Sequence, residues 1–225
     1  MARDIGAGPW CKQERDASVG AGPRTAVPSL VMSASARPAK RRPTYADVEA
    51  LPPHVVGEII AGELVVSPRP SPPHAQTASA LGFVIGGPFG FGAGGPGGWW
   101  IVDEPELRLG IDPDFDPVVP DLAGWRRERM PHLPQTSWFD GVPDWICEVL
   151  SPSTEATDRA DKLPFYARAG VRHAWLVDPI LFTVEICRLL DDGGWRLVAT
   201  HRGNVTVRAE PFDAVEINLA LLWER

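Results

Sequence analysis

A mixed β-sheet flanked by a few helices, an α+β arrangement within the broad α/β class, is the fold that this sequence predicts. Three observations lead to it. Short apolar runs rich in β-branched and aromatic residues recur along the chain, as expected for strands. Stretches that mix apolar with small polar residues lie between some of these runs and suit helices. The 225 residues suffice for one well-filled domain, and two would be cramped.

The start of the folded region is predicted to contain a short helix and a β-hairpin. Thr44 is a good N-cap for a helix over residues 45–51, which Pro52 would end. Residues 55–66 then resemble two strands joined by a turn at residues 61–62. The fold is therefore expected to begin at Thr44.

A helix, a glycine-rich segment and a series of strands are expected next. The helix would span residues 74–85, and the glycine-rich residues 86–98 would form a flexible loop. Gly170 suits the left-handed position that follows a helical turn over residues 165–169. Strands are expected at residues 99–102, 107–109, 118–123, 145–149 and 173–177, with a late β-hairpin at 182–190 and 195–200 toward the C-terminus.

Charge divides the chain into two parts. Residues 1–43 contain eight Lys and Arg against three Asp and Glu, a net charge of +5, without a sustained hydrophobic period. We expect a disordered, basic extension here and hypothesise that the native protein starts at Met32. Residues 44–225, the expected folded domain, hold 14 Lys and Arg against 26 Asp and Glu, a net charge of −12. An acidic domain of this kind is unusual for a protein that binds DNA tightly without sequence specificity.

The sequence predicts neither a membrane protein nor a secreted one. No apolar run approaches the ~20 residues that a membrane-spanning helix needs. The chain also does not start with a basic segment followed by an apolar core, as a secretory signal would. Cys147 and Cys187 lie in strand-like runs, where reduced, buried thiols are expected. The expected compartment is the cytoplasm.

Lys162 is the only lysine after Lys40. The remainder of this region uses arginine for every other positive charge, so a single lysine suggests a role that a guanidinium cannot fill. Glu148 interrupts the apolar run 145–150, and Asp121 follows another apolar stretch. An Asp, a Glu and a Lys placed in this order are the working parts of a metal-dependent phosphodiesterase.

Each of these three residues has a catalytic interpretation and a simpler one. Two carboxylates on neighbouring strands can share Mg²⁺ and leave sites for water and a phosphate, while a lysine stabilises the charge that accumulates on the phosphate. Alternatively, Glu148 could face solvent or an arginine from an edge strand, and Asp121 could belong to a Pro-Asp turn. Lys162 could be an exposed helix residue.

A longer pattern joins these residues and extends from about residue 44 to about residue 190. Its parts are Glu-Ile-Ile-Ala-Gly-Glu-Leu at 58–64, Ser71 with His74, Asp121, Asp-Trp-Ile-Cys-Glu-Val-Leu-Ser-Pro-Ser-Thr at 144–154, Asp158, Asp161-Lys162, Tyr166, Gly170-Val171 and Trp-Leu-Val-Asp-Pro at 175–179. In these motifs the chain resembles the Uma-two family, restriction-endonuclease-like proteins of the PD-(D/E)XK superfamily. The combination of Glu-Val-Leu-Ser-Pro-Ser-Thr with a downstream Asp-Lys is its most distinctive part.

The resemblance implies a restriction-endonuclease-like core, a mixed β-sheet flanked by helices. It also implies dependence on Mg²⁺, with Mn²⁺ as a substitute, and hydrolysis of phosphodiester bonds in DNA. By the same resemblance, Asp121 and Glu148 would be metal ligands and Lys162 the catalytic lysine. Glu58 would be an additional carboxylate near the metal, and His74 a further candidate for the site.

The position of the lysine departs from the superfamily pattern. The superfamily's name places the lysine two residues after the glutamate on the same strand, but Leu150 occupies that position here. The resemblance implies that Lys162 reaches the site from the following helical segment. Pro164 is expected to lie near the start of that helix, since proline is tolerated in a first turn.

Arg126, Arg127 and Arg129 form the densest cationic cluster of the folded region and follow soon after Asp121. They are candidates for contact with DNA phosphates near the metal, and a solvated loop is an equal alternative. The leading hypothesis is a Mg²⁺-dependent endonuclease that acts on DNA. A homodimer is expected because two sites cut two strands most easily.

Two other interpretations stay open. A catalytically inactive copy of the nuclease fold could serve as a binding or interaction module, which the acidic charge favours and the intact Asp-Glu-Lys set opposes. An unrelated mixed α/β or mainly β protein could bind a small ligand. In that second case, Glu148 and Lys162 would lie far apart.

Overall fold

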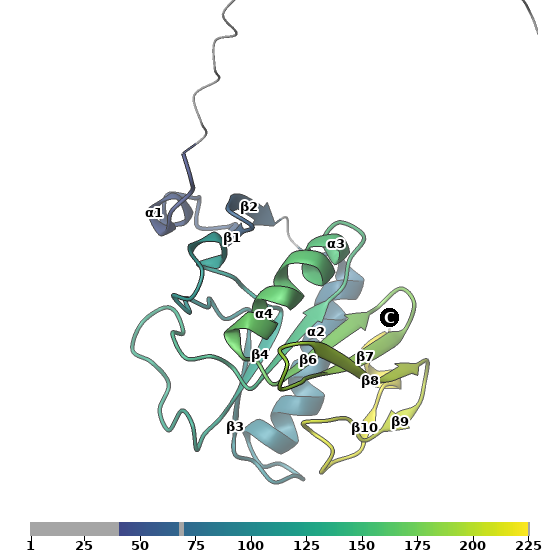
Figure 1. Ribbon diagram of the computed structural model, residues 1–225. Coiled ribbons are helices and arrows are strands. Elements are labelled where there is room, and N and C mark those ends of the chain that lie inside the picture. The colour runs from purple at the N-terminus through teal and green to yellow at the C-terminus, as the bar shows by residue number, and fades with distance from the viewer. Residues whose placement is uncertain (1–40, 68–69, 225) are drawn as a thin grey trace, which may run out of the picture. The chain divides into compact units, whose positions relative to one another are not determined.

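The computed structural model describes residues 41–67 and 70–224 (Figure 1). The predictions of a disordered extension over residues 1–43 and of a start at Met32 lie outside this range, except for residues 41–43. The helical elements are α1 (Tyr45–Glu49), α2 (Pro72–Ile85), η1 (Gly86–Gly90), η2 (Pro113–Phe115), α3 (Glu155–Thr157), η3 (Asp158–Lys162), α4 (Leu163–Ala169) and α5 (Ala220–Trp223). The strands are β1 (Val56–Ile60), β2 (Glu63–Ser67), β3 (Trp99–Asp103), β4 (Leu122–Arg126), β5 (Trp145–Val149), β6 (His173–Asp178), β7 (Thr183–Leu189), β8 (Trp195–Arg202), β9 (Thr206–Val207) and β10 (Ile217–Asn218).

Six of these strands form one mixed sheet in the order β3-β4-β5-β6-β7-β8. β5 and β6 run parallel, and the other neighbouring pairs in this sheet are antiparallel. A parallel pair needs a crossover connection, and here α3, η3 and α4 supply it. The predicted mixed sheet flanked by helices is confirmed, and the late hairpin forms β7 and β8 at one edge of the sheet.

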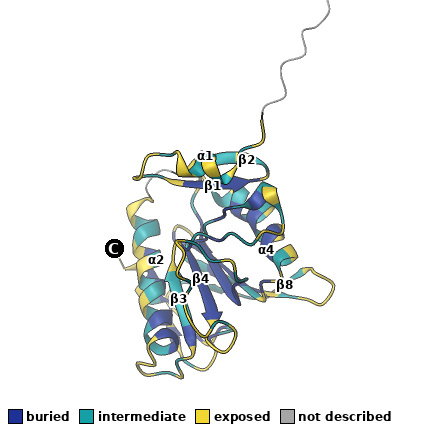
Figure 2. Ribbon diagram, turned by 90° about the vertical axis from the view of Figure 1, so that its left-hand side faces the viewer, coloured by how far each residue is buried: buried dark blue, intermediate teal, exposed yellow. Residues whose placement is uncertain are grey.

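Each face of this sheet carries its own hydrophobic core. Side chains alternate along β5, so Trp145, Cys147 and Val149 pack on the face covered by α2, and Ile146 packs on the face covered by α4. Figure 2 shows α2 on one side of the buried strands and α4 on the other. Glu148 shares the face of Ile146, so its carboxylate points toward the α4 side.

The predicted β1–β2 hairpin is confirmed. Ala61 and Gly62 form its turn with φ values of 50° and 76°, as a tight two-residue hairpin requires. The backbone N–H of Ile59 donates to the carbonyl of Pro117 at 2.9 Å, which ties the hairpin to the segment that precedes β4. This contact places Glu58 of β1 beside that segment.

Close packing of β4 depends on Gly124. A Cβ atom at this position would lie 3.2 Å from the Trp145 ring and 3.3 Å from the Trp99 ring, on the two neighbouring strands. Two large rings can therefore cover the strand at a point where a side chain would force them apart. Along its length β4 joins one end of the sheet to the other. Asp121 immediately precedes its first residue, and Arg126 is its last residue.

Two of the predicted strands need correction. Residues 118–123 were expected to form one strand, but β4 begins only at Leu122, since Pro120 has no N–H to donate to a ladder. Residues 107–109 were also expected to be a strand, and only Leu107 forms isolated bridges there, to Val118 and Phe139. Asp121 therefore lies before its strand, beside the end of the antiparallel β5.

The predicted flexible loop over residues 86–98 starts as a helix. Residues 86–90 form the π-helical element η1, which continues α2, and Phe89 within it is buried in the core on the α2 face. Buried aromatic surface stabilises this glycine-rich segment despite its low helix propensity. α1 also differs slightly from the prediction, since it ends at Glu49, before residue 51.

The predicted helix start near Pro164 is confirmed, since α4 begins at Leu163 with Lys162 just before it and Pro164 in its first turn. The shorter helical elements α3 and η3 precede it from Glu155. The π-helical η3 immediately precedes the α-helical turn that contains Pro164. A π-turn shifts the hydrogen-bonding pattern of a helix, and a proline that cannot donate is tolerated where that ladder is interrupted. Gly170 ends α4 with a φ of 84°, as predicted.

Two further sequence predictions concern cysteines and membranes. Cys147 and Cys187 are buried free thiols, as predicted. Among residues 41–67 and 70–224, each helix is too short or too polar to cross a membrane.

Candidate active site

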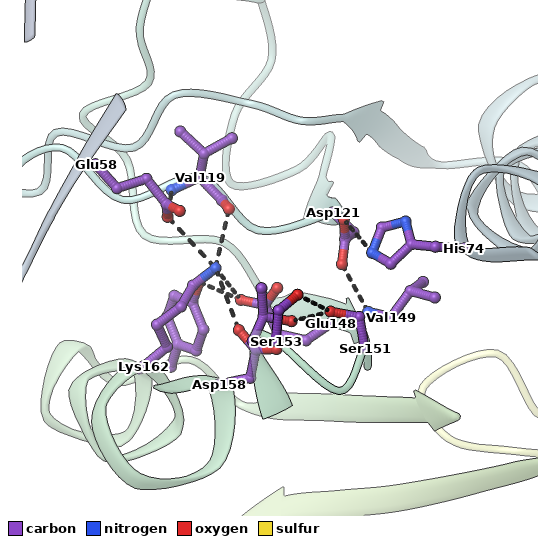
Figure 3. Close-up of polar contacts among 12 residues, drawn as sticks. Glu58, His74, Val119, Asp121, Glu148, Val149, Ser151, Ser153, Asp158 and Lys162 are labelled. Atoms are coloured by element: carbon purple, nitrogen blue, oxygen red, sulfur yellow. Dashed lines mark hydrogen bonds and ion pairs between the residues drawn. The ribbon is translucent and has the colours of Figure 1, made fainter. Parts of the chain in front are cut away.

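A cavity of about 590 Å³ lies where β5 ends and β4 begins (Figure 3). The chain reaches it from separate elements: β1, the start of α2, the residue before β4, the end of β5 and the π-turn η3. The predicted site residues on its walls are Glu58, His74, Asp121, Glu148 and Lys162. The structure thus brings together all five residues that the sequence singled out for catalysis or as a possible site residue.

Glu148 is held on the α4 face of β5 by two donors. The hydroxyl of Tyr166 donates to its Oε1 atom at 2.7 Å, and the Nζ atom of Lys162 lies 2.9 Å from the same oxygen. Glu148 is 2% exposed, so these contacts offset part of the cost of burying a carboxylate. The simpler interpretation, an edge-strand glutamate in solvent, is excluded because β5 lies inside the sheet.

Lys162 reaches the cavity from η3, the π-turn that precedes α4. Its Nζ atom donates to the carbonyl of Val119 at 3.0 Å and lies 3.4 Å from Oε1 of Glu58 and 3.8 Å from Oδ1 of Asp158. The same Oε1 atom of Glu58 accepts the backbone N–H of Val119 at 2.7 Å. With Glu148, the buried ammonium group is therefore surrounded by oxygen atoms from four different parts of the chain.

Asp121 faces the cavity from the residue before β4. Its Oδ2 atom accepts the backbone N–H of Val149 at 2.6 Å, which joins β4 to the end of β5. Its Oδ1 atom lies 3.3 Å from Nε2 of His74. The opposite ring nitrogen of His74, Nδ1, is buried without a hydrogen-bond partner among the described residues. His74 thus orients Asp121 from the start of α2.

Negative charge dominates the cavity. Burial raises the pKa of Glu148, an effect that the charge of Lys162 opposes and that Asp158 and Asp121 reinforce. Burial also raises the pKa of Asp158, to about 6. Burial lowers the pKa of Lys162, but the surrounding carboxylates outweigh this effect and raise it well above its ordinary value. Lys162 therefore stays charged, but its single ammonium group cannot neutralise all the carboxylates of the cavity.

His74 responds to the same surroundings. Burial lowers the pKa of its imidazole, but the hydrogen bond and the charge of Asp121 outweigh burial, so the net pKa is raised. The attraction between His74 and Asp121 is strongest when the imidazole is protonated and the carboxylate is ionised. A cation next to Asp121 would reverse this preference by competing for the carboxylate.

The donor set of the cavity fits a hard divalent cation. Its walls carry the carboxylates of Glu58, Glu104, Asp121, Glu148 and Asp158 against the single ammonium of Lys162. Within the described residues, no three His, Cys, Asp or Glu side chains converge to ligate one ion. Mg²⁺ is commonly held by one or two carboxylates, with waters and substrate phosphates completing its shell. Asp121 and Glu148 would be the residues that hold it.

The three arginines expected near the metal lie elsewhere. Arg126 is the last residue of β4, about 16 Å from Asp121 at ~3.3 Å per residue along the strand. Arg127 donates to the carbonyl groups of residues 90 and 99 and lies over the Trp100 ring. Arg129 pairs with Asp144 at 2.5 Å. The structure does not bring this cluster to the cavity, which corrects the expectation of a contact near the metal.

Two residues at the site were not assigned a role from the sequence. Asp158 lines the cavity one helical turn before Lys162, and Tyr166 contacts Glu148 from one turn after it. Their spacing of four residues on either side of the lysine places all three on one face of a helix, a signal that was available in the sequence. The small-ligand alternative is excluded, since it required Glu148 and Lys162 to lie far apart.

Comparison with known proteins adds to this geometry. The model of the Uma2 family, described as "Putative restriction endonuclease", matches residues 44–221 of the chain. The crystal structure of a putative nuclease belonging to DUF820 from Anabaena variabilis is similar, with a TM-score of 0.58 and 21% sequence identity. The match covers 80% of this chain and 97% of that chain, and at this identity it shows a shared fold. No curated protein matches the chain.

Proposed function

The chain belongs to the Uma2 family of nucleases, and from this premise we propose that it is a Mg²⁺-dependent endonuclease that hydrolyses phosphodiester bonds in DNA. Mn²⁺ is the expected substitute, because it accepts the same oxygen ligands. The family description and the nuclease fold of the Anabaena variabilis protein support a nuclease. The choice of Mg²⁺ and DNA rests on the donor set of the cavity and on the family.

One observation carries this proposal. The buried ammonium of Lys162 lies 2.9 Å from the carboxylate of Glu148, at the wall of a cavity that Asp121 also lines. A buried ion pair with excess carboxylates is a poor device for stability, since the cost of removing charges from water offsets their attraction. Groups with perturbed pKa values that converge in a cavity are instead typical of functional sites.

Each residue has a part in the proposed reaction. Asp121 and Glu148 would hold Mg²⁺, and the bound ion would supply Lewis-acid stabilisation of the phosphate and would make the attacking water more acidic. Lys162, held by the carbonyl of Val119 and by Glu148, stabilises the negative charge that builds up on the phosphate oxygens. Glu58 keeps the ammonium in place from the other side.

Calorimetric titration of the full chain with Mg²⁺ tests the metal site directly. Saturable binding is expected for the wild type and is expected to be lost in Asp121→Ala. Asp161→Asn is a matched control, because it removes one carboxylate next to Lys162 that does not line the cavity. Cleavage of supercoiled DNA with Mg²⁺, Mn²⁺ or EDTA then tests the activity, and RNA of the same sequence tests the preference for DNA.

The inactive binding module remains the second candidate, and the net charge of −12 over residues 44–225 is the observation that favours it. No Mg²⁺ binding by the wild type, even with DNA present to complete the coordination shell, would support the module over the enzyme. A homodimer is proposed with the nuclease, and sedimentation of the full chain checks it separately.

A further inference from the structure

A second cavity, of about 270 Å³, lies at the opposite end of the sheet. Its walls come from the last residue of β4, the residue before β5, the start of β6 and the end of β7. They are formed by Arg126, Asp144, Arg172, His173, Arg188 and Leu189. Along β5, Asp144 is four residues from Glu148, so about 13 Å at ~3.3 Å per residue separates this cavity from the active site. The two cavities share no lining residue.

The second cavity is positively charged, although the domain around it is acidic. Three arginines line it against one aspartate, Asp144. Asp144 already has partners for both of its oxygen atoms: Oδ1 lies 2.5 Å from Arg129, which is not a lining residue, and Oδ2 accepts the backbone N–H of Arg126 at 2.9 Å. Arg188 is paired with Glu210, whose carboxylate accepts two hydrogen bonds from the guanidinium.

Arg126 and Arg172 are the two arginines of this cavity that lack a carboxylate partner among the described residues. In the part of the chain that the structure describes, neither guanidinium lies within ion-pair distance of a carboxylate. The guanidinium of Arg126 lies 4.6 Å from the centre of the Trp99 ring, which holds it in place without neutralising it. A guanidinium that is positioned in advance and not neutralised is the arrangement that binds an oxyanion well.

His173 adds a hydrogen-bonding atom that lacks a partner. Its Nδ1 atom is buried and makes no hydrogen bond among the described residues, with Glu210 beyond hydrogen-bond distance at 3.9 Å. Burial lowers the pKa of its imidazole, as does the charge of Arg188 and Arg126, while Glu210 and Asp144 oppose this effect. A buried donor or acceptor without a partner is costly, and a ligand or water that bonds to it removes the cost.

We propose that this cavity is a second anion site, which binds one phosphate group between Arg126, Arg172 and His173. The volume favours a single small group, since pockets for drug-sized ligands are larger, roughly 300–1,000 Å³. The phosphate can come from free inorganic phosphate or from a DNA segment that extends past the end of the sheet. Binding of free phosphate does not depend on the proposed nuclease activity.

Titration of the metal-free full chain with inorganic phosphate tests the site. Calorimetry is expected to show saturable binding that weakens about tenfold or more in Arg172→Ala and in Arg126→Ala, the usual loss for one charged hydrogen bond. Arg202→Ala is the matched control, because it removes an exposed arginine at the far end of β8 and should leave phosphate affinity unchanged. Phosphate should also shift the imidazole ¹⁵N resonances of His173 and leave those of His74 unchanged.

The proposal would be overturned if the wild type showed no saturable phosphate binding, or if both arginine variants retained the binding. A shift at His74 in place of His173 would assign the phosphate to the active site and overturn it as well. If phosphate binds as expected, the dependence of DNA affinity on salt identifies the source. With a DNA phosphate as the natural ligand, Arg172→Ala lowers DNA affinity and reduces the slope of log K against log salt by about one. With free phosphate as the ligand, DNA binding stays unchanged while phosphate binding is lost.

Discussion

The Nζ atom of Lys162 and the hydroxyl of Tyr166 both contact the same oxygen, Oε1 of Glu148, at 2.9 and 2.7 Å. Two donors on one oxygen fix the orientation of the carboxylate against the helix that covers it. The glutamate of β5 and the lysine of η3 are thereby joined into one unit, although they belong to different elements. Lys162 thus reaches Glu148 from η3, while the strand position two residues after the glutamate is filled by the buried apolar side chain of Leu150.

Replacing Glu148 by Gln is expected to lower the rate of DNA cleavage by at least about 10²-fold, the scale of loss for a preorganised electrostatic contact. The amide keeps the shape of the carboxylate but not its charge, so it would hold the proposed Mg²⁺ more weakly. Cleavage assays check the rate, and thermal unfolding checks that the fold is retained. Asp161→Asn should cleave like the wild type. Wild-type cleavage by Glu148→Gln would remove Glu148 from the mechanism.

Lys162→Met is expected to destabilise the protein in a pH-dependent manner. Without the ammonium, Glu148 and Asp158 lose the charge that opposes the rise of their pKa values. Their ionisation then costs more, so stability is lost as pH rises and regained as pH falls and the carboxyl groups protonate. The free energy of unfolding in urea should be lower than wild type by about 3 kcal/mol at pH 8, with a smaller difference at pH 5. An equal loss at both values would argue against this explanation.

Asp158→Asn is expected to stabilise the protein above pH 6. Burial raises the pKa of Asp158 to about 6, so its protonated form is favoured in the folded state. That contribution is complete below the ordinary value of 3.8 and is lost as pH rises through about 6. An asparagine does not ionise, and its advantage at pH 7.5 should be on the order of 2 kcal/mol and vanish toward pH 4. Urea unfolding across this range measures it, and a pH-independent difference would contradict it.

Arg159→Ala is expected to lower the cleavage rate by about tenfold with little change in the affinity for DNA. Arg159 lies in η3 and makes two hydrogen bonds to Glu185 of β7, at 2.7 and 3.0 Å, which anchor the π-turn on the sheet. A small displacement of this turn moves Lys162, and misplaced catalytic groups are costly. Single-turnover kinetics separate the rate from binding. Glu155→Ala, which removes only the contact within the helix, is the control and should have a smaller effect.

The sequence predicted most of the sheet, because its central strands are strongly patterned. β5 consists of five buried residues and starts and ends where expected. β4 was misplaced because Leu-Ala-Gly-Trp-Arg contains two residues with low β-propensity, whereas the preceding valines look more like a strand. The late start of β4 matters for the site. Asp121 lies before the strand and not at its end, and Arg126 lies at the far end of the sheet and not near the expected metal.

The residues of the active site were easier to predict than their contacts. Glu148 and Lys162 were identifiable because a carboxylate in an apolar run and a single lysine are unusual. The π-turn that carries Lys162 was not predictable from local propensity, since its geometry depends on packing against the sheet and on the contact between Arg159 and Glu185. The second cavity was also not predictable from the sequence, because it forms only where the start of β6 pairs with the end of β7 and brings His173 opposite Arg188.

The walls of the catalytic cavity come from the first hairpin, from α2, from two neighbouring strands and from the crossover helix. All of these parts lie between His54 and Lys162, and the hairpin that supplies Glu58 is far in sequence from the turn that supplies Lys162. A chain that has lost any one of these parts lacks a wall of the cavity. The cavity is therefore complete only when the hairpin and the crossover helix are both folded against the sheet, so the arrangement of its residues is a property of the tertiary fold and not of any one local motif.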